Sequence, residues 1–354
     1  MSIAPVNSPL QDFLTWHADI TWLDWGDLKA RLDADTDITL DQIRQLPGHI
    51  VINTTYDAFD PEELVQDTLK YRLDLMGDIL VNDPALVENN PGLNYRYFPF
   101  FVLKAISIVN DQRDSAINWQ TRNFLLSCMN RHARPHRYLV YWLLRRMSWN
   151  NQMYLSFGNF KAYNTYEVDW SAPQLSLDEI TDTFKYMVHP NFNFTEFRNF
   201  YENEITRFPW TTDSGYNWGA GLPSDDYSLS GTADCYINLV TETSMHFYCP
   251  TEKLIKAIQA GCLVAPAASQ HDLVKLSSLG FDFNYTGFDV LAVDAIPDWV
   301  DRCFAVTTLV DSVRDSIADV WQSNLTTLQN NQALFRSQAL RDQCVAGIAD
   351  LLVA

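Results

Sequence analysis

The strongest constraint on the fold of this chain is a repeated alternation of short apolar runs with helical patterns. Its clearest instance is the stretch from Cys235 to Pro266, where "CYINLV" and "CLVAP" flank "TEKLIKAIQAG". The two flanking runs are apolar and contain β-branched residues, as buried strands do. The central segment predicts a helix that begins at the Pro250–Thr251 pair and ends at Gly261. Such units predict an α/β fold with largely parallel sheets.

The same alternation occurs in the first third of the chain. The run "HIVINTT" (His49–Thr55) predicts a buried strand, and the segment Pro61–Asp78 predicts a helix with proline and two acids in its first turn. The runs "DILVN" and "YRYFPFFVLKA" also have the character of strands. A second series opens with the apolar strand "NFLLSCM" (Asn123–Met129).

The length of 354 residues, of which 47% are hydrophobic, is ample for a core and indicates two domains. We expect an N-terminal α/β domain over residues 1–120 and a second domain over residues 121–300. Helical patterns fill residues 301–354, and a return of these helices to the first domain is left open.

The net charge of −19 disfavours nucleic acid as a partner, because a protein that grips duplex DNA along its phosphates usually has a basic surface. A local basic groove remains compatible with an acidic chain. The six cysteines form no CxxC pair, which indicates free thiols in a reducing cytoplasm. The N-terminus has no signal-peptide pattern, and no apolar stretch approaches the ~20 residues that span a bilayer. We therefore expect a soluble cytoplasmic protein with no membrane span.

Charged residues surround the predicted connection between the strand "CYINLV" and the next helix. Glu242 stands at the C-terminal end of the strand, and Glu252 and Lys253 stand in the first turn of the helix. A lysine is unfavourable at the positive end of a helix dipole unless an anion such as phosphate binds there. The alternative interpretation is a solvated lysine paired with a neighbouring acid.

A second group of cations lies in "SCMNRHARPHRYLVYWLL", at another predicted strand-to-helix turn. Arg131, Arg134 and Arg137 fall within seven positions of an otherwise acidic chain. Arginine makes bidentate contacts with phosphate, and ligands of open α/β sheets bind beyond the carboxyl ends of strands. Together the two turns predict a diphosphate site, with surface salt bridges as the alternative. The chain has neither a Walker A motif nor GxGxxG, which argues against a P-loop NTPase and a standard dinucleotide domain.

The stretch "LVTET…TEKLIKAIQAGCLVAP" with the following "LVKLSSLGFDF" resembles the C-terminal donor-binding domain of GT-B glycosyltransferases. The resemblance is to fucosyltransferase-like and exostosin-like members, and it covers about Asn123–Phe283, in the C-terminal half only. It rests on Glu242-Thr243, on Thr251-Glu252-Lys253 and on the Ala260-Gly261 turn. The upstream Asn130 and Arg137 match the Asn…Arg segment that opens the same domain.

This resemblance implies a GT-B-like α/β fold of two Rossmann-like domains that face a cleft. It also implies transfer of a sugar from a nucleotide-diphosphate sugar to the hydroxyl of a glycan or another acceptor. Lys253 and Arg137 would contact the donor diphosphate, Glu252 the nucleotide ribose, and Glu242 the donor sugar. The remaining donor-binding candidates are Asn130, Arg131, Arg134 and Thr251. Such enzymes usually need no metal or other cofactor, and the sequence shows no convincing metal site.

The family commonly inverts the anomeric carbon, which requires a base for the acceptor proton. That base would come from the N-terminal domain, and Asp57, just beyond the strand "HIVINTT", is the candidate. Its rivals are Asp24, Asp27 and Asp60. The aromatic side chains that are candidates for stacking on an acceptor are Trp22, Trp25 and the run from Tyr95 to Phe101.

Two other functions are compatible with the sequence. The first is a glycosyltransferase that acts on modified nucleic-acid bases, which would require a basic groove on the N-terminal domain. The second is a non-catalytic protein that keeps the fold and binds a sugar nucleotide without turning it over. A donor-hydrolysis assay separates the second alternative from an enzyme.

Overall fold

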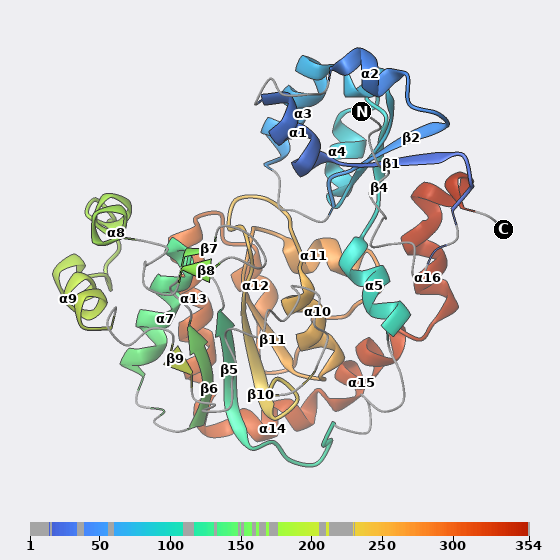
Figure 1. Ribbon diagram of the computed structural model, residues 1–354. Coiled ribbons are helices and arrows are strands. Elements are labelled where there is room, and N and C mark those ends of the chain that lie inside the picture. Colours follow the sequence, from blue (N-terminus) through green and yellow to red (C-terminus); the bar gives the residue numbers. More distant parts are fainter. Residues whose placement is uncertain are drawn as a thin grey trace. The chain divides into compact units, whose positions relative to one another are not determined.

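The computed structural model of the protein divides into two compact units (Figure 1). Unit 1 comprises Met1–Val109, Phe247–Cys249 and Phe335–Ala354, and unit 2 comprises Asn110–His246 and Pro250–Leu334. None of the helices in the described part of the chain has the length and hydropathy needed to cross a lipid bilayer. The structure describes residues 14, 16–33, 39–55, 60–108, 117–130, 133–147, 149, 152–157, 161–162, 168–169, 176–204, 210–211, 229 and 231–352.

Unit 1 is built on a four-stranded parallel sheet with the order β1-β2-β3-β4. The predicted strand at His49 is confirmed as β2, and its apolar side chains form part of the core of unit 1. The strands are β1 (Ile20–Asp24), β2 (His49–Asn53), β3 (Gly77–Val81) and β4 (Tyr95–Tyr97). The helices between and after them are α1 (Trp25–Asp33), α2 (Leu40–Arg44), α3 (Pro61–Tyr71), α4 (Pro84–Asn89) and α5 (Phe100–Ile108).

Helix α3 begins as the sequence predicts, with the Asp60 carboxylate accepting hydrogen bonds from the amides of Glu62 and Glu63. The prediction that this helix continues to Asp78 is wrong. Arg72 adopts φ of 53°, in the left-handed region, and this ends the helix. The chain then makes a short 3-10 turn (Leu73–Leu75) and enters β3.

The prediction that the run "YRYFPFFVLKA" is a strand is also wrong for most of its length. Only its first three residues form β4, and α5 begins at Phe100. A short apolar run does not distinguish a buried strand from a buried helix by periodicity. Pro99 precedes the helix, and its carbonyl accepts a hydrogen bond from the amide of Leu103. Proline has no amide to donate, which is tolerated at the start of a helix.

The C-terminal segment of the chain belongs to unit 1. Helix α16 (Gln338–Val345) packs on α5, and the 3-10 helix η5 (Ala346–Leu351) packs on β4. Arg96 of β4 holds this segment, because its guanidinium donates to both carboxylate oxygens of Asp350 at 2.7 and 3.1 Å. The same side chain pairs with Asp78 through Nε at 2.8 Å, and Asp78 also lies 2.8 Å from Nε2 of His49.

Unit 2 contains a five-stranded sheet with the order β11-β10-β5-β6-β9. The first four strands are parallel, and β9 runs antiparallel to β6. The chain moves outward from β5 to β6, and later returns to the other side of β5 through β10 and β11. The order of the strands therefore reverses between β5 and β10. The strands are β5 (Phe124–Asn130), β6 (Met153–Phe157), β9 (Trp210–Thr211), β10 (Cys235–Thr241) and β11 (Leu263–Ala267).

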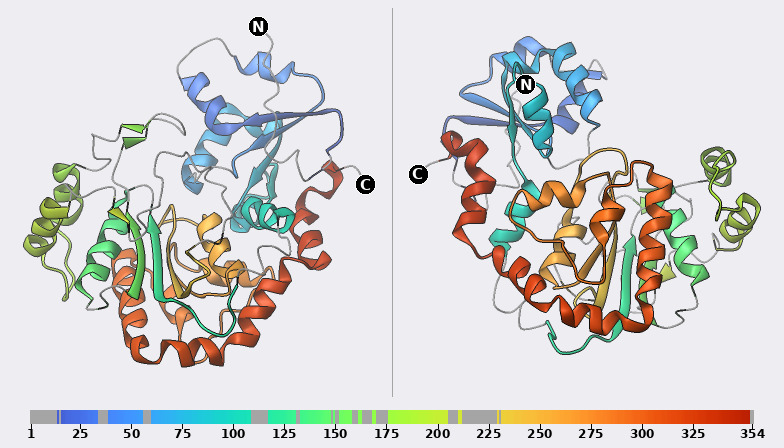
Figure 2. Two further views of the ribbon diagram at one scale, coloured as in Figure 1. Left: turned by 60° about the horizontal axis from the view of Figure 1, so that its bottom comes forward. Right: turned by 180° about the vertical axis from the view of Figure 1, so that it is seen from behind.

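Three helices near the C-terminus, α13 (Trp299–Ser312), α14 (Ile317–Ser323) and α15 (Leu325–Leu334), curve around one end of this sheet, as Figure 2 shows. Helix α13 packs on α7 (Pro135–Arg146) and β11, α14 packs on β10, and α15 packs on α10 (Glu252–Gln259). The longer helices of unit 2 are α7 (Pro135–Arg146), α8 (Leu177–Phe184), α9 (Phe194–Glu204), α10 (Glu252–Gln259), α13 (Trp299–Ser312) and α15 (Leu325–Leu334). The shorter elements are β7 (Lys161–Ala162), β8 (Val168–Asp169), α11 (Asp272–Ser277), α12 (Val290–Asp294) and α14 (Ile317–Ser323). Both units therefore belong to the Rossmann-like α/β class.

Candidate functional site

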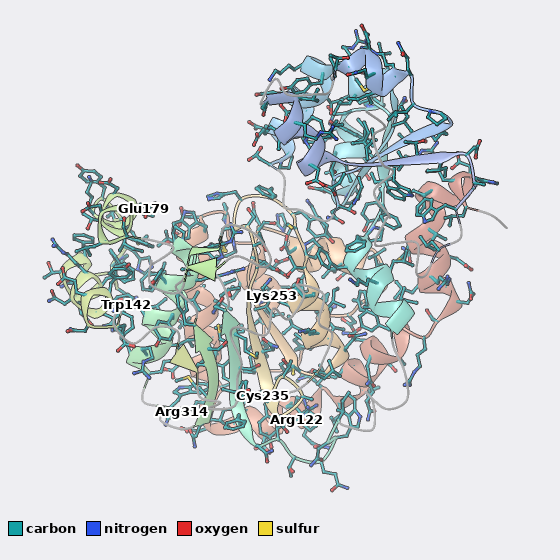
Figure 3. The ribbon with its side chains drawn as sticks, viewed as in Figure 1. Arg122, Trp142, Glu179, Cys235, Lys253 and Arg314 are labelled. Carbon is teal, nitrogen blue, oxygen red and sulfur yellow. The ribbon has the colours of Figure 1, made fainter. Side chains whose placement is uncertain are left out.

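The candidate site lies at the carboxyl ends of β5 and β10 in unit 2, where the strand order reverses. In open α/β sheets this position is the usual ligand site, because the connections diverge there and leave a crevice. Asn130 ends β5, and Glu242 follows the last residue of β10. Figure 3 shows Lys253 away from Cys235, the first residue of β10, and toward the other end of the strand. Asn130 joins the two strands, because its Oδ1 accepts a hydrogen bond from the hydroxyl of Thr241.

Glu242 holds the N-terminus of α10. Its side chain is buried, and its two carboxylate oxygens accept hydrogen bonds from the amide of Thr251 at 2.9 Å and from the hydroxyl of Thr251 at 2.5 Å. Burial raises the pKa of Glu242, and the nearby Lys253 and the bonds from Thr251 oppose that rise. The carboxylate therefore connects the end of β10 to the start of the next helix.

Lys253 folds back onto the first turn of α10. Thr251 is the N-cap of this helix, and its hydroxyl oxygen accepts from the amide of Lys253 at 3.4 Å and from the Lys253 ammonium at 3.1 Å. The ammonium also lies 3.1 Å from Oε1 of Glu252. The Lys253 side chain keeps 25% of its area exposed. Two carboxylates, on Glu242 and Glu252, thus offset a lysine at the positive end of the helix, and the predicted phosphate contact stays a prediction.

Arg137 is buried behind the same edge of the sheet. It is only 2% exposed, and its guanidinium donates to the backbone carbonyls of Thr241 at 3.2 Å and Glu242 at 3.1 Å. Burial, followed by the charge of the neighbouring Arg134, lowers the pKa of Arg137 to about 10. In this position the arginine fixes the end of β10 and thereby the orientation of Glu242.

His136 supports the same carbonyl. Its Nε2 lies 2.8 Å from the oxygen of Glu242 and donates to it, which requires the tautomer with hydrogen on Nε2. Burial, followed by the charge of Arg137, lowers the pKa of His136 well below its usual value. The imidazole is therefore neutral at physiological pH and acts as a hydrogen-bond donor.

The other predicted site residues fall in different places. Arg134 is the N-cap residue of α7, is exposed, and is close enough to lower the pKa values of His136 and Arg137. Arg131 and Asp57 lie outside the described residues. In unit 1, Trp22 and Trp25 are 5% and 0% exposed, so they belong to its core and are not available for stacking on an acceptor.

Sequence reasoning missed a second buried arginine at this edge. Arg302 of α13 is 1% exposed, and it donates to the carbonyl of Met245 at 2.8 Å and to that of Ala268 at 2.9 Å. It therefore ties the loop after β10 to the loop after β11. The available signal was a single arginine within the apolar helical run "WVDRCFAVTTLV".

A buried carboxyl group was also missed. Asp272 is fully buried at the start of α11, and its Oδ1 accepts a hydrogen bond from the hydroxyl of Ser269. The sequence pairs Ser269 and Asp272 as a capping-box-like start, whereas the residue before the helix is His271, with φ of 65°. The helix amides of Leu273 and Val274 donate to Asp294. Burial raises the pKa of Asp272 well above its usual value, and Glu242 adds to this rise.

Comparison with known protein families found no model that matches the chain, and comparisons with curated proteins and solved structures found no match. The fold and the site therefore define the class of the protein only as Rossmann-like α/β. Within that class, unit 2 has a partly exposed lysine, Lys253, at a helix start beside the reversal of its strand order.

Proposed function

We propose that the protein is a glycosyltransferase that moves a sugar from a nucleotide-diphosphate sugar to an acceptor hydroxyl. The observation that carries the proposal is the position of Lys253. This partly exposed ammonium lies at the N-terminus of α10, the helix that follows β10, and the strand order of the sheet reverses between β5 and β10. Helix N-termini and lysines both favour phosphate, and Rossmann-like sheets bind nucleotides where their strand order reverses.

The roles that we assign to the cations follow from how exposed their side chains are. Lys253 and the exposed Arg134 are the cations proposed to contact the donor diphosphate. The buried Arg137 is proposed to act indirectly, because its guanidinium already holds the carbonyls of Thr241 and Glu242. Positive charge near the leaving diphosphate stabilises the negative charge that develops as the glycosidic bond breaks. In this proposal the two units form a GT-B-like pair, with the donor on unit 2 and the acceptor on unit 1.

The test is the change Lys253→Ala with titration calorimetry against UDP-glucose, UDP-N-acetylglucosamine, GDP-mannose and GDP-fucose. Loss of one charged contact to phosphate is expected to weaken donor binding by about 10- to 100-fold. Lys256→Ala, in the last turn of the same helix, is the matched control and is expected to leave the affinity unchanged. Equal affinity of the Lys253→Ala variant and the wild type would contradict the proposal.

The titration, together with assays of donor hydrolysis and of sugar transfer, separates the alternatives. Donor binding without hydrolysis or transfer would support a non-catalytic sugar-nucleotide-binding protein. Transfer to duplex DNA with modified bases, but not to glycans, would identify a nucleic-acid acceptor. Inversion at the anomeric carbon and independence of metal are part of the proposal, and they are checked by NMR of the product and by activity in EDTA.

A further inference from the structure

An exposed histidine, His246, lies on the loop that leaves β10, shortly after Glu242. Its backbone amide donates to the hydroxyl oxygen of the buried Ser244 at 3.1 Å. Its ring meets the ring of Trp299, the first residue of α13, edge to face, with 6.5 Å between the centroids. Neither ring nitrogen of His246 has a hydrogen-bond partner among the described residues, so both are available to a ligand.

The backbone next to His246 is held by the buried Arg302. The guanidinium donates to the carbonyl of Met245, the residue before His246, at 2.8 Å, and to that of Ala268, just after β11, at 2.9 Å. It also donates to two carbonyls just before α13. Three segments at this end of the sheet therefore share one cation, whose burial is compensated by its hydrogen bonds. The exposed imidazole consequently lies on a loop whose backbone is fixed within unit 2.

His246 also lies near the connection that leaves β5. This connection carries Arg134 and His136, at the start of α7. Burial is the main cause of the lowered pKa of His136, and the charges of Arg134 and His246 add to it, so both lie within electrostatic range of that imidazole. His136 itself donates to the carbonyl of Glu242. The exposed groups of the two connections, Arg134 after β5 and His246 after β10, thus lie near the same end of β10.

The side chains that reach the surface at this end of β10 suit an anion. Lys253 is partly exposed and positively charged, whereas the acidic Glu242 is buried and already accepts two hydrogen bonds from Thr251. An imidazole has at least one N–H group in either protonation state, so His246 can donate at any physiological pH. The oxygens of a diphosphate accept such bonds strongly, because they are charged.

We propose that His246 donates a hydrogen bond to a phosphate oxygen of the nucleotide diphosphate, alongside Lys253, and that Arg302 is the positioning residue that holds the loop of His246. This inference rests on the proposed function. The proton stays on the imidazole throughout. Its partial positive charge stabilises the negative charge that the diphosphate gains as the sugar leaves it.

The test compares two substitutions of His246 by calorimetry with UDP, GDP and inorganic pyrophosphate. His246→Phe keeps an aromatic ring against Trp299 and removes both nitrogens. Its affinity is expected to fall by about 10- to 100-fold, as for the loss of a hydrogen bond to a charged group. His246→Gln loses the ring but keeps an N–H donor, and it is expected to bind more tightly than the phenylalanine variant. A role in packing alone predicts the reverse order and would overturn the proposal.

His271→Asn is the matched control. His271 is also exposed, but it lies on the loop after β11, which β10 separates from β5 in the sheet. Its φ of 65° is a conformation that asparagine tolerates. The variant is expected to bind all three ligands with wild-type affinity. A loss as large as that of His246→Phe would overturn the specific role of His246.

Arg302→Lys tests the positioning role, because lysine keeps the charge but lacks the planar fork that reaches several carbonyls. Binding is expected to weaken clearly in the wild-type background and much less in the His246→Phe background. Losses that simply add in the double variant would show that Arg302 does not act through His246. Ser244→Ala, which removes the acceptor of the His246 amide, replaces Arg302→Lys in the same comparison if circular dichroism shows that the lysine variant is unfolded.

The outcomes separate this inference from the proposed function. Wild-type affinity in His246→Phe, with weakened binding in Lys253→Ala, would overturn the role of His246 and leave the proposed function intact. Weakened binding in both variants, in a protein that neither hydrolyses nor transfers sugar from any of the four nucleotide sugars, would support the role of His246 and contradict the glycosyltransferase. A wild type that binds none of UDP, GDP and pyrophosphate would overturn both.

Discussion

At the scale of single residues, the carboxyl edge of unit 2 is notable for charges that are buried and held by the backbone. The guanidinium groups of Arg137 and Arg302 donate to peptide carbonyls, and Glu242 accepts from the N-cap of α10. A buried charge is expensive unless it is hydrogen-bonded, and the loss of one partner leaves the other uncompensated. Asp272 is also buried at this edge, and its Oδ2 has no hydrogen-bond partner among the described residues.

Asp272→Asn is expected to raise the melting temperature at neutral pH. Because burial raises the pKa of Asp272, keeping the proton in the folded state costs stability wherever the unfolded chain would have released it. This cost is absent below the ordinary aspartate value of 3.8, grows as the pH rises, and is complete at the folded pKa. Asparagine removes the cost and keeps an oxygen for the Ser269 hydroxyl.

The measurement is thermal unfolding of both proteins at pH 4 and at pH 7.5, with a larger gain expected at pH 7.5. Asp319→Asn, an exposed position on α14, serves as the control and is expected to show no such difference. A stability gain at Asp272 that is equal at both pH values would show that its titration is not the cause.

At the scale of elements, α10 is defined by its two ends. Thr251 caps the start, and Gly261 follows the end with φ of 64°, where glycine is favoured. A Cβ at Gly261 would lie 2.4 Å from the ring of Trp119. The carbonyl of Gly261 also accepts a hydrogen bond from the indole of Trp321 at 2.9 Å. The "AG" turn that contributes to the family resemblance therefore has a local physical reason.

Gly261→Ala is expected to destabilise unit 2 by more than about 1–2 kcal/mol, the usual penalty for an L-residue in the left-handed region, because the contact with Trp119 adds to it. Gly92→Ala is the matched control, since a Cβ there would meet no atom within 4 Å and φ is not positive. Thermal unfolding should show a clear drop for the first variant and little change for the second. Equal melting temperatures would show that Trp119 and the backbone adjust at low cost.

At the scale of the whole molecule, the chain enters unit 1 three times. The N-terminal part forms its sheet, Phe247–Cys249 line a pocket in this unit, and Phe335–Ala354 add α16 and η5. The last contact includes Arg96, whose guanidinium joins Asp78 of the sheet to Asp350 of the C-terminal segment. A bidentate arginine–carboxylate pair is more specific in geometry than an isolated surface pair.

Arg96→Ala is expected to loosen the C-terminal segment without unfolding unit 2. Hydrogen exchange measured by mass spectrometry should become faster in α16 and η5, because both contacts to Asp350 are lost. Arg44→Ala is the control, since Arg44 pairs with Asp41 on the exposed side of one helix and such pairs contribute little. Unchanged exchange in the Arg96 variant would assign the docking of the segment to apolar packing alone.

Much of the strand and helix content of both units could be predicted from local periodicity and from start signals. Asp60–Pro61 and Thr251 act as helix starts in the structure as they do in the sequence pattern. Two predictions were wrong where the local pattern was ambiguous. Arg72 ends α3 in a left-handed conformation that its residue type does not indicate, and the apolar run from Tyr95 is mostly helical.

The residues of the candidate site were named from the sequence, but their arrangement depends on strand order. The chain carries Lys253 and Glu242 on one strand–helix unit, so their proximity is a local property that the pattern of residues could predict. Arg137 lies about a hundred positions earlier, and it meets Glu242 because β10 pairs with β5. That pairing depends on long-range packing, which also buries Arg137 and brings Arg302 and Asp272 to the same edge. Short-range periodicity therefore determines the helices, the strands and their caps. How deeply the charged side chains are buried, and which groups they bond, is decided only when distant strands pair.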